Sequence, residues 1–197
     1  VIATLTHRAV EQGHEVVICT GDRDAFQLVS DKVTLIYPVR GVSEVWRMDP
    51  AAVTEKYLVP PERYSDLAAL VGESSDNLPG VPGVGPKTAA AIMREFASLD
   101  ALYADLERVR GLPIRGAAKL PEKLLQHRDA AYLARQLTAI ACDMPLDIDH
   151  AALRPRAPDM AGLTAYFDGL GFGPMLRRQA ERLAALSATR ATATALR

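Results

Sequence analysis

The chain has 197 residues, of which 49% are hydrophobic and 24% are charged. This length and composition suffice for a packed core and exclude a disordered protein. No apolar run approaches the length of a membrane-spanning helix, so we expect a soluble protein with no membrane partner. The two cysteines, Cys19 and Cys142, lie far apart, which excludes a disulfide framework and favours a reducing compartment, the cytoplasm.

Charge is unevenly distributed along the chain. The net charge is -1, but residues 1–80 carry 12 acidic against 7 basic residues, whereas residues 81–197 carry 12 against 16. Carboxylates that bind divalent metal ions are neutralised by those ions, so the near-zero total does not exclude nucleic acid as a partner. The chain begins at Val1 within a helical pattern that has no capping residue, and we therefore expect a truncated N-terminus.

In chain order, the first third of the sequence alternates between helix and strand. Apolar residues at helical spacing predict a helix from Ile2 that is ended by Gly13, and residues 15–19 predict a short buried strand. Asp49 followed by Pro50 predicts a helix N-terminus. Two further strands are predicted at residues 33–37 and 43–48, with a turn between them at residues 38–41. This part of the chain is therefore α/β.

Beyond residue 60 strands become scarce and the pattern is helical. Pro60 and Pro61 predict another helix start. Six further helices are predicted between clusters of glycine and proline, at residues 87–96, 99–109, 117–126, 130–141, 160–170 and 175–186. The low-complexity end of the chain predicts a flexible tail. We therefore expect an α/β part at residues 1–59, a helical part at 60–186 and a tail at 187–197.

Two short acidic clusters are candidates for metal binding. Asp22 and Asp24 follow a predicted strand, at the end where α/β sheets usually form ligand crevices. Glu73 and Asp76 lie in a loop rich in turn residues. Carboxylates brought together repel unless a cation intervenes, and oxygen ligands without a neighbouring His or Cys favour Mg²⁺ or Mn²⁺. Each cluster alone also fits an ordinary solvated turn or helix cap.

A run rich in glycine and proline, at residues 80–86, leads into an apolar helix. Gly83 and Gly85 permit tight turns that expose backbone amides, and Lys87 and Thr88 stand in the first helical turn, where anions bind. A nucleotide-binding loop is rejected because a proline interrupts the required Gly-Lys pair and no strand precedes the run. The run fits a backbone phosphate of nucleic acid, and it also fits a helix-helix connection without a ligand.

The run TGDRDAFQLV, followed by ALVGESSDNLPGVPGVGPKTA, resembles the bacterial 5′ nuclease family. This family comprises the 5′-3′ exonuclease domain of DNA polymerase I and free-standing relatives akin to flap endonucleases. The two motifs stand in the family's order, and the resemblance extends from Val1 to about Leu186. It implies a partial PIN-like α/β nuclease core with a parallel sheet, followed by a mainly helical helix-three-turn-helix DNA-binding region whose hairpin is GVPGVG.

The resemblance also implies roles for individual residues. Asp22, Asp24 and Asp76 correspond to the family's catalytic metal ligands. Glu73 stands where most relatives have Asp, and it would assist the second ion. The implied cofactors are two Mg²⁺ or Mn²⁺ ions, with K⁺ held by the hairpin carbonyls in several relatives. The residues that would contact DNA are those of the hairpin and the helix after it, Gly83, Gly85, Lys87 and Thr88.

The family's further acidic ligands and its helical arch precede the helix that begins here at Val1. The resemblance therefore implies that this chain corresponds to the C-terminal part of such a nuclease and is poorly active alone. The implied function is metal-dependent hydrolysis of DNA at 5′ ends or 5′ flaps by a monomer, in replication or repair.

Two alternatives remain open. One is a non-catalytic module that binds duplex DNA, which the hairpin and the missing upstream ligands favour. The other is a phosphohydrolase of the haloacid-dehalogenase type, which uses an Asp-x-Asp after a strand. That class requires Asp22 as a covalent nucleophile, and it leaves the glycine-rich hairpin unexplained.

Overall fold

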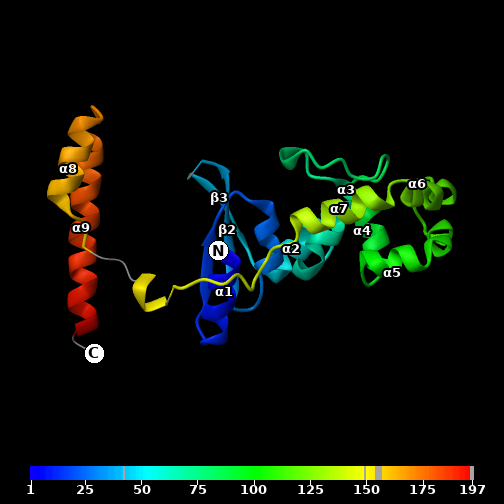
Figure 1. The fold of residues 1–197 in the computed structure, drawn as a ribbon, viewed down its shortest axis with the longest axis horizontal. Helices are drawn as coiled ribbons and strands as arrows, with labels where there is room; N and C mark the ends of the chain where they lie inside the picture. Colours follow the sequence, from blue (N-terminus) through cyan, green and yellow to red (C-terminus); the bar gives the residue numbers. More distant parts are fainter. Residues whose placement is uncertain (42, 149, 154–156, 196–197) are drawn as a thin grey trace. The chain divides into compact units, whose positions relative to one another are not determined.

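The computed structural model describes residues 1–41, 43–148, 150–153 and 157–195. The chain divides into two compact units, Val1–Leu146 and Asp147–Arg197, and each is treated by itself below. The first unit contains the sheet and the helices α1 to α7 (Figure 1). In the described part of the chain, no helix combines the length and the apolar character needed to cross a membrane.

The sheet has three strands, which lie in the order of the sequence: β1 (Val16–Cys19), β2 (Val33–Arg40) and β3 (Glu44–Met48). β1 runs parallel to β2, with Val16 opposite Val33, and β3 runs antiparallel to β2. The three predicted strands are confirmed. The expected turn at 38–41 is shorter than predicted because β2 continues to Arg40. The sheet is therefore mixed rather than wholly parallel.

β1 is less buried than its sequence indicated. Of its four residues only Ile18 is buried, while Val17 is 62% exposed. β1 pairs with β2 along one edge, and no strand among the described residues pairs with its other edge. Successive side chains of a strand point to opposite faces, so an apolar residue on the uncovered face stays exposed. The prediction was right about the strand and wrong about its burial.

Capping residues determine the ends of the helices near the sheet. α1 (Ile2–Glu11) is followed by Gly13, whose φ is +84°, as expected for a glycine that ends a helix. Asp49 accepts a hydrogen bond from the N–H of Ala52 at 2.8 Å and so caps α2 (Pro50–Tyr57). Both ends were predicted correctly because the determining residues are local.

A 3₁₀ helix at Arg23–Leu28 connects β1 to the core beside the sheet. Its residue Phe26 is completely buried. The ring of Phe26 lies 5.5 Å from that of Tyr37, 5.0 Å from that of Tyr57 and 5.5 Å from that of Tyr64. Aromatic pairs at such distances add to the free energy gained by burial. This cluster anchors the segment that carries Asp22 and Asp24.

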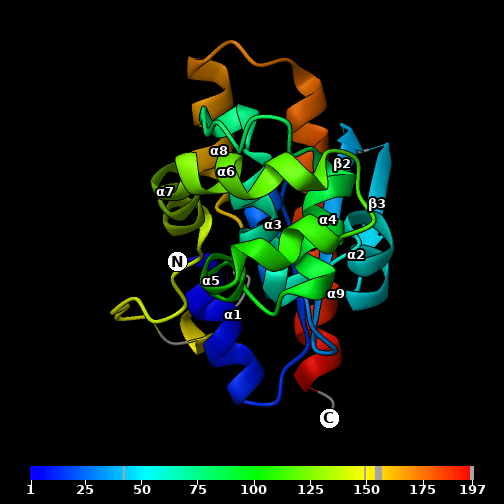
Figure 2. The ribbon, with the colours of Figure 1, turned by 90° about the vertical axis from the view of Figure 1, so that its right-hand side faces the viewer.

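A second core holds the helical part of the first unit. Its central helix α3 (Tyr64–Val71) packs against α4 (Pro86–Glu95) and α7 (Arg128–Thr138) (Figures 1 and 2). The expected division at residue 59 falls inside this compact unit and does not separate its two cores, because Val59 belongs to the helical core while Tyr64 and Ala68 belong to the core beside the sheet. The shorter helices of this part are α5 (Leu99–Ala104), α6 (Leu120–Gln126) and 3₁₀ helices at Pro61–Arg63, Ser74–Asp76, Leu106–Gly111 and Ala117–Lys119.

The helix predicted at 99–109 is two elements. α5 ends at Ala104, Asp105 leaves the helical region with φ -141° and ψ 62°, and a 3₁₀ helix follows. A 3₁₀ helix repeats every three residues, which places Leu106 and Val109 on one face, and both contact the core. The predicted helix at 117–126 likewise begins with a 3₁₀ turn before α6.

The second unit contains α8 (Met160–Gly169) and α9 (Pro174–Ala195), which pack against each other. Asp159 caps α8 by accepting a hydrogen bond from the N–H of Gly162 at 3.0 Å. α9 extends through residues 187–195, which we expected to form a flexible tail. Four of those nine residues are alanine, the strongest helix former, and they offset the weaker helix propensity of one serine and three threonines. Residues 196–197 lie outside the described residues.

Candidate active site

Asp22 and Asp24 lie where the chain leaves β1. Asp22 caps the 3₁₀ helix, because its Oδ1 accepts a hydrogen bond from the N–H of Asp24 at 3.0 Å. The N–H of Asp22 in turn donates to Oγ1 of Thr20 at 3.1 Å. Asp22 therefore has the capping role that Asp commonly has in a turn. It fixes the two carboxylates on one turn at the carboxyl end of the strand.

Glu73 and Asp76 lie in a short closed loop after α3. The N–H of Glu73 donates to the carbonyl of Leu78, and the N–H of Leu78 donates to the carbonyl of Glu73, both at 3.0 Å. Inside the loop Ser74–Asp76 forms one 3₁₀ turn, and Asn77 adopts a left-handed conformation with φ of 57°. Asn tolerates this conformation better than most residues. The loop therefore has a defined backbone that fixes the position of Asp76.

Gly72 and Gly80 form the neck of this loop. A Cβ on Gly80 would lie 2.2 Å from the carbonyl carbon of Val71, and a Cβ on Gly72 would lie 2.3 Å from the backbone nitrogen of Gly80. Two backbone segments approach this closely only where neither residue has a side chain. Neither glycine was among the predicted site residues, although a close approach of two backbone segments is a common reason for glycine at a position. They join the acidic loop directly to the glycine-rich hairpin.

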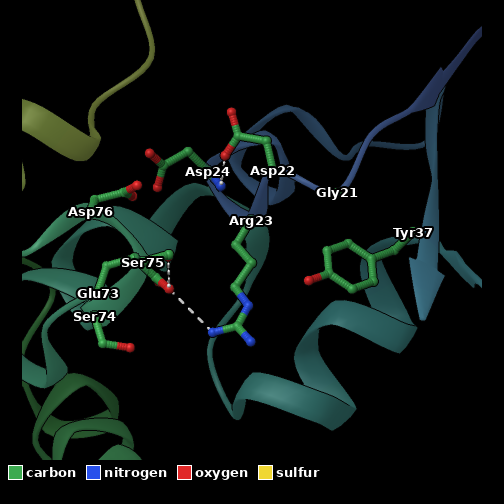
Figure 3. Close-up of a pocket in the computed structure, with 9 residues that line it drawn as sticks. All are labelled: Gly21, Asp22, Arg23, Asp24, Tyr37, Glu73, Ser74, Ser75 and Asp76. Carbon is green, nitrogen blue, oxygen red and sulfur yellow. Dashed lines mark hydrogen bonds and ion pairs between the residues drawn. The ribbon is translucent and has the colours of Figure 1, made fainter. Parts of the chain in front are cut away.

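The two acidic clusters meet at one pocket of about 520 Å³. Its lining contains all four predicted carboxylates, and its full set of residues is Gly21, Asp22, Arg23, Asp24, Tyr37, Glu73, Ser74, Ser75 and Asp76 (Figure 3). Figure 3 shows the carboxylates of Asp22, Asp24 and Asp76 gathered on one side, while that of Glu73 is directed towards Arg23. The structure therefore brings the two clusters together, as expected, and separates Glu73 from the three aspartates.

Among the four carboxylates, Asp24 has both a raised pKa and a buried oxygen without a partner. Burial, followed by the negative charges of Asp22, Asp76 and Glu73, raises the pKa of Asp24 to about 7. Its Oδ1 is buried and has no hydrogen-bond partner. A proton or a cation would remove the cost of such an oxygen.

The aspartates fit a hard divalent cation such as Mg²⁺ or Mn²⁺ in charge and in ligand type. Among the described residues, however, no group of three or more acidic, His or Cys side chains is placed to hold a metal ion as it stands. The unpaired oxygen of Asp24 is therefore the observation that supports a cation here. Completing a metal site requires movement of these side chains or further ligands.

Glu73 already has partners. It is 7% exposed, and its Oε1 accepts hydrogen bonds from Arg23 at 3.2 Å and from Oγ of Ser75 at 2.9 Å. A carboxylate paired with a guanidinium is not free to neutralise a second cation. The expected role of Glu73 at the second ion therefore stays a prediction, and it requires Arg23 to move. Sequence reasoning missed Arg23, for which the only signal was its place between Asp22 and Asp24.

The hairpin after the neck presents exposed backbone between two buried anchors. Val81 and Val84 are buried, and the residues between them are exposed. The N–H of Val84 donates to the carbonyl of Val81 at 2.9 Å, which closes the turn. Gly83, at φ +84°, occupies the left-handed position that this turn requires. Gly85 is the cap residue before α4, and a Cβ there would contact nothing within 4 Å.

Positive charge is available at the same hairpin. Lys87 is exposed in the first turn of α4, and Thr88 beside it is half-buried. Nζ of Lys123, from α6, lies 3.2 Å from the place a Cβ of Gly83 would take. The helix start, its exposed backbone and these two lysines form a surface suited to a phosphate. The four predicted DNA-contacting residues are therefore adjacent, and Lys123 is an addition that only the fold reveals.

Two family models match this chain. A model described as "5'-3' exonuclease, N-terminal resolvase-like domain" matches residues 1–58, and one described as "5'-3' exonuclease, C-terminal SAM fold" matches residues 59–161. DNA polymerase I of Mycobacterium leprae is 46% identical over 184 residues, which cover 93% of this chain and 19% of that protein. The thermostable DNA polymerase I of Thermus filiformis is 42% identical over 89% of this chain and 20% of that protein. The chain thus spans about a fifth of the length of these relatives.

Two solved structures share the fold. The T5 5′-exonuclease with bound divalent metal ions (zinc) superposes with a TM-score of 0.55 at 22% identity, covering 69% of this chain and 48% of that one. The catalytic core of Rad2 in complex with DNA substrate superposes with a TM-score of 0.54 at 17% identity, covering 90% of this chain and 60% of that one. These similarities confirm the predicted architecture, an α/β core followed by a helical region.

Proposed function

Because this chain belongs to the 5′-3′ exonuclease family, we propose that it carries metal-binding and DNA-binding parts of a 5′-3′ exonuclease or flap endonuclease. The observation that carries the proposal is the meeting of two acidic clusters at one pocket, where a buried oxygen of Asp24 lacks a partner. The relatives are DNA polymerases I, which supports a role of the proposed reaction in DNA replication or repair.

In this proposal Asp22, Asp24 and Asp76 bind two divalent ions, Mg²⁺ or Mn²⁺, and Glu73 joins them only after it releases Arg23. When bound, such ions lower the pKa of a water molecule and stabilise the negative charge that develops at the leaving 3′ oxygen. The carboxylates position the ions and do no covalent chemistry. The zinc ions in the T5 5′-exonuclease structure support dependence on a divalent metal without identifying which one.

The proposed partner of the hairpin is the DNA backbone. Gly83 and Gly85 leave the amides accessible, while Lys87 adds positive charge and Thr88 adds a hydroxyl donor. Contacts of this kind go to phosphates and carry no sequence information. The proposed substrate is therefore DNA recognised by its structure, with a 5′ flap or a 5′ end, bound by a monomer. Hairpin carbonyls that hold K⁺ are a further part of the proposal.

The test is cleavage of a 5′-flap DNA by the full-length gene product with Mg²⁺ or Mn²⁺. We expect products with 5′-phosphates, and we expect Asp22→Asn and Asp76→Asn to remove most cleavage while leaving DNA affinity nearly unchanged. The reason is that the ions act on charge that develops in the transition state, whereas the hairpin binds the duplex separately. Asp31→Asn, at an exposed turn outside the pocket, is the matched control and should cleave normally.

The same experiment distinguishes the second candidate function, a non-catalytic module that binds duplex DNA. The exposed hairpin and the absence of a ready metal site among the described residues favour that candidate. Tight DNA binding by the full-length protein with no metal-dependent cleavage would establish the binding module and overturn the nuclease proposal.

A further inference from the structure

We propose that a second pocket, next to the acidic one, binds a backbone phosphate of the DNA substrate through Lys56. The inference deepens the proposed function and rests on it. The pocket has a volume of about 350 Å³, and its lining includes Arg23, Tyr37, Trp46, Lys56 and Tyr57. It therefore falls within the size range of about 300–1,000 Å³ that is usual for ligand sites.

The two pockets share a wall. Arg23 and Tyr37 line both of them, so a group bound in one lies next to a group bound in the other. A DNA strand carries one phosphate per nucleotide. In the proposal, a strand with one phosphate at the acidic pocket places a neighbouring phosphate on the far side of Arg23 and Tyr37.

The charge of this second pocket is opposite to that of the first. Its charged lining residues are Arg23 and Lys56, and none of the described Asp or Glu residues lines it. Glu73, which lines the acidic pocket, forms an ion pair with Arg23. Within the described part of the chain, none of the ion pairs involves Lys56. Burial, and then the charge of Arg23, lowers the pKa of Lys56, and the negative charge of a bound anion would oppose this shift.

Aromatic contacts hold Lys56 at this position. Its Nζ lies 3.1 Å from the ring centroid of Trp46 and 5.6 Å from that of Tyr57. Trp46 stacks on Tyr37 with ring centroids 6.0 Å apart and planes inclined by 20°, yet Trp46 remains 39% exposed. An ammonium group that is fixed by a cation–π contact and has no carboxylate partner is well placed to bind a phosphate.

The test is a titration of the chain with 5′-flap DNA, followed by fluorescence anisotropy at several salt concentrations in Mg²⁺. All proteins carry Asp76→Asn, so that the DNA is not cut. We expect Lys56→Met to weaken binding about fivefold and to reduce the slope of log affinity against log salt by about 0.7–0.9, the contribution of one phosphate. Lys56→Arg keeps the charge and should restore most of the affinity. Lys32→Met, at an exposed lysine outside the pocket, is the matched control.

Trp46 provides a second readout because it is the only tryptophan in the sequence. Because Nζ of Lys56 lies over the Trp46 ring, a phosphate bound to Lys56 should change the fluorescence of Trp46, and Lys56→Met should abolish that change. If Lys56→Met left affinity and salt slope unchanged, the proposal that this pocket binds a phosphate would be wrong, and the proposed function would stand. A loss of affinity that accompanies a loss of thermal stability, with no rescue by Lys56→Arg, would also overturn it. Failure of the Asp76→Asn parent chain to bind DNA would overturn both.

Discussion

The acidic pocket and the hairpin are joined by the same pair of glycines, yet they are organised in opposite ways. The pocket gathers carboxylates that repel one another, and Asp24 keeps an oxygen without a partner. The hairpin is supported by Val81 and Val84 and presents exposed backbone and Lys87. A proton or a cation would therefore stabilise the pocket, whereas the hairpin already presents its backbone and Lys87 to solvent.

The largest expected effect comes from the neck that joins the two regions. Gly80→Ala should lower the free energy of unfolding by about 3 kcal/mol, because its Cβ would overlap the backbone of Val71 and force the chain to shift. Urea denaturation measures this change. Gly85→Ala is the control, since a Cβ there meets nothing within 4 Å, and it should change stability by less than about 1 kcal/mol. Equal stability of the two variants would show that the close approach at the neck is not required.

Asp24→Asn tests the electrostatic side of the comparison. The pKa of Asp24 in the folded protein, about 7, is above its unfolded value, so stability falls as pH rises towards and through 7. At pH 8 without metal, Asp24→Asn should therefore raise the free energy of unfolding by about 1 kcal/mol. This value is smaller than the full pKa shift implies, because solvent screens the partly exposed Asp24.

With metal present, the unchanged protein should be more stable than Asp24→Asn. Mn²⁺ should raise the melting temperature of the unchanged protein, because it binds only the folded state, and have little effect on Asp24→Asn. Differential scanning fluorimetry with and without Mn²⁺ measures both effects, with Asp31→Asn as the control. If Mn²⁺ stabilised Asp24→Asn as much as the unchanged protein, Asp24 would not be a metal ligand.

Gly83→Ala tests the backbone side of the comparison. At φ +84° an alanine costs about 1 kcal/mol, and the added Cβ also displaces the amine of Lys123. We expect a modest fall in the free energy of unfolding together with weaker DNA binding. Gly85→Ala again serves as the control for stability. A Gly83→Ala variant that is unchanged in both measurements would show that the left-handed turn is dispensable.

Lys87→Ala should have the smallest effect. Lys87 is exposed and makes no ion pair among the residues described, so stability should not change. DNA binding should weaken about fivefold, with a reduction of about 0.9 in the salt slope and equal losses on duplexes of different sequence. Losses that depend on the base sequence would instead indicate that the helix start contacts bases.

Local signals account for what the sequence predicted correctly. Gly13 and the Asp49 cap each determine an element boundary through residues next to it, and the structure confirms both. The meeting of the two acidic clusters was expected from the resemblance to the 5′ nuclease family, which implies one metal site for Asp22, Asp24 and Asp76. Local patterns alone indicate only a strand end and a loop rich in turn residues.

Contacts between distant segments account for what the sequence did not predict. The partner of Glu73 is Arg23, fifty positions away, and nothing local distinguishes a carboxylate that binds a metal from one that binds a guanidinium. The exposure of Val17 depends on which strands pair with β1. The end of α5 before Asp105 depends on how Val109 packs into the core. Each outcome is decided by tertiary packing rather than by propensity.

The closed loop between Gly72 and Gly80 has a consequence for the length of a reaction product. Two backbone hydrogen bonds close the loop at Glu73 and Leu78, and the neck glycines leave no space for the backbone to shift. Asp76 and the hairpin are therefore parts of one rigid segment. In a nuclease built in this way, residues inserted in this segment would move the cut along the strand, because the segment fixes Asp76 relative to the hairpin. The number of nucleotides released would then be determined by main-chain geometry.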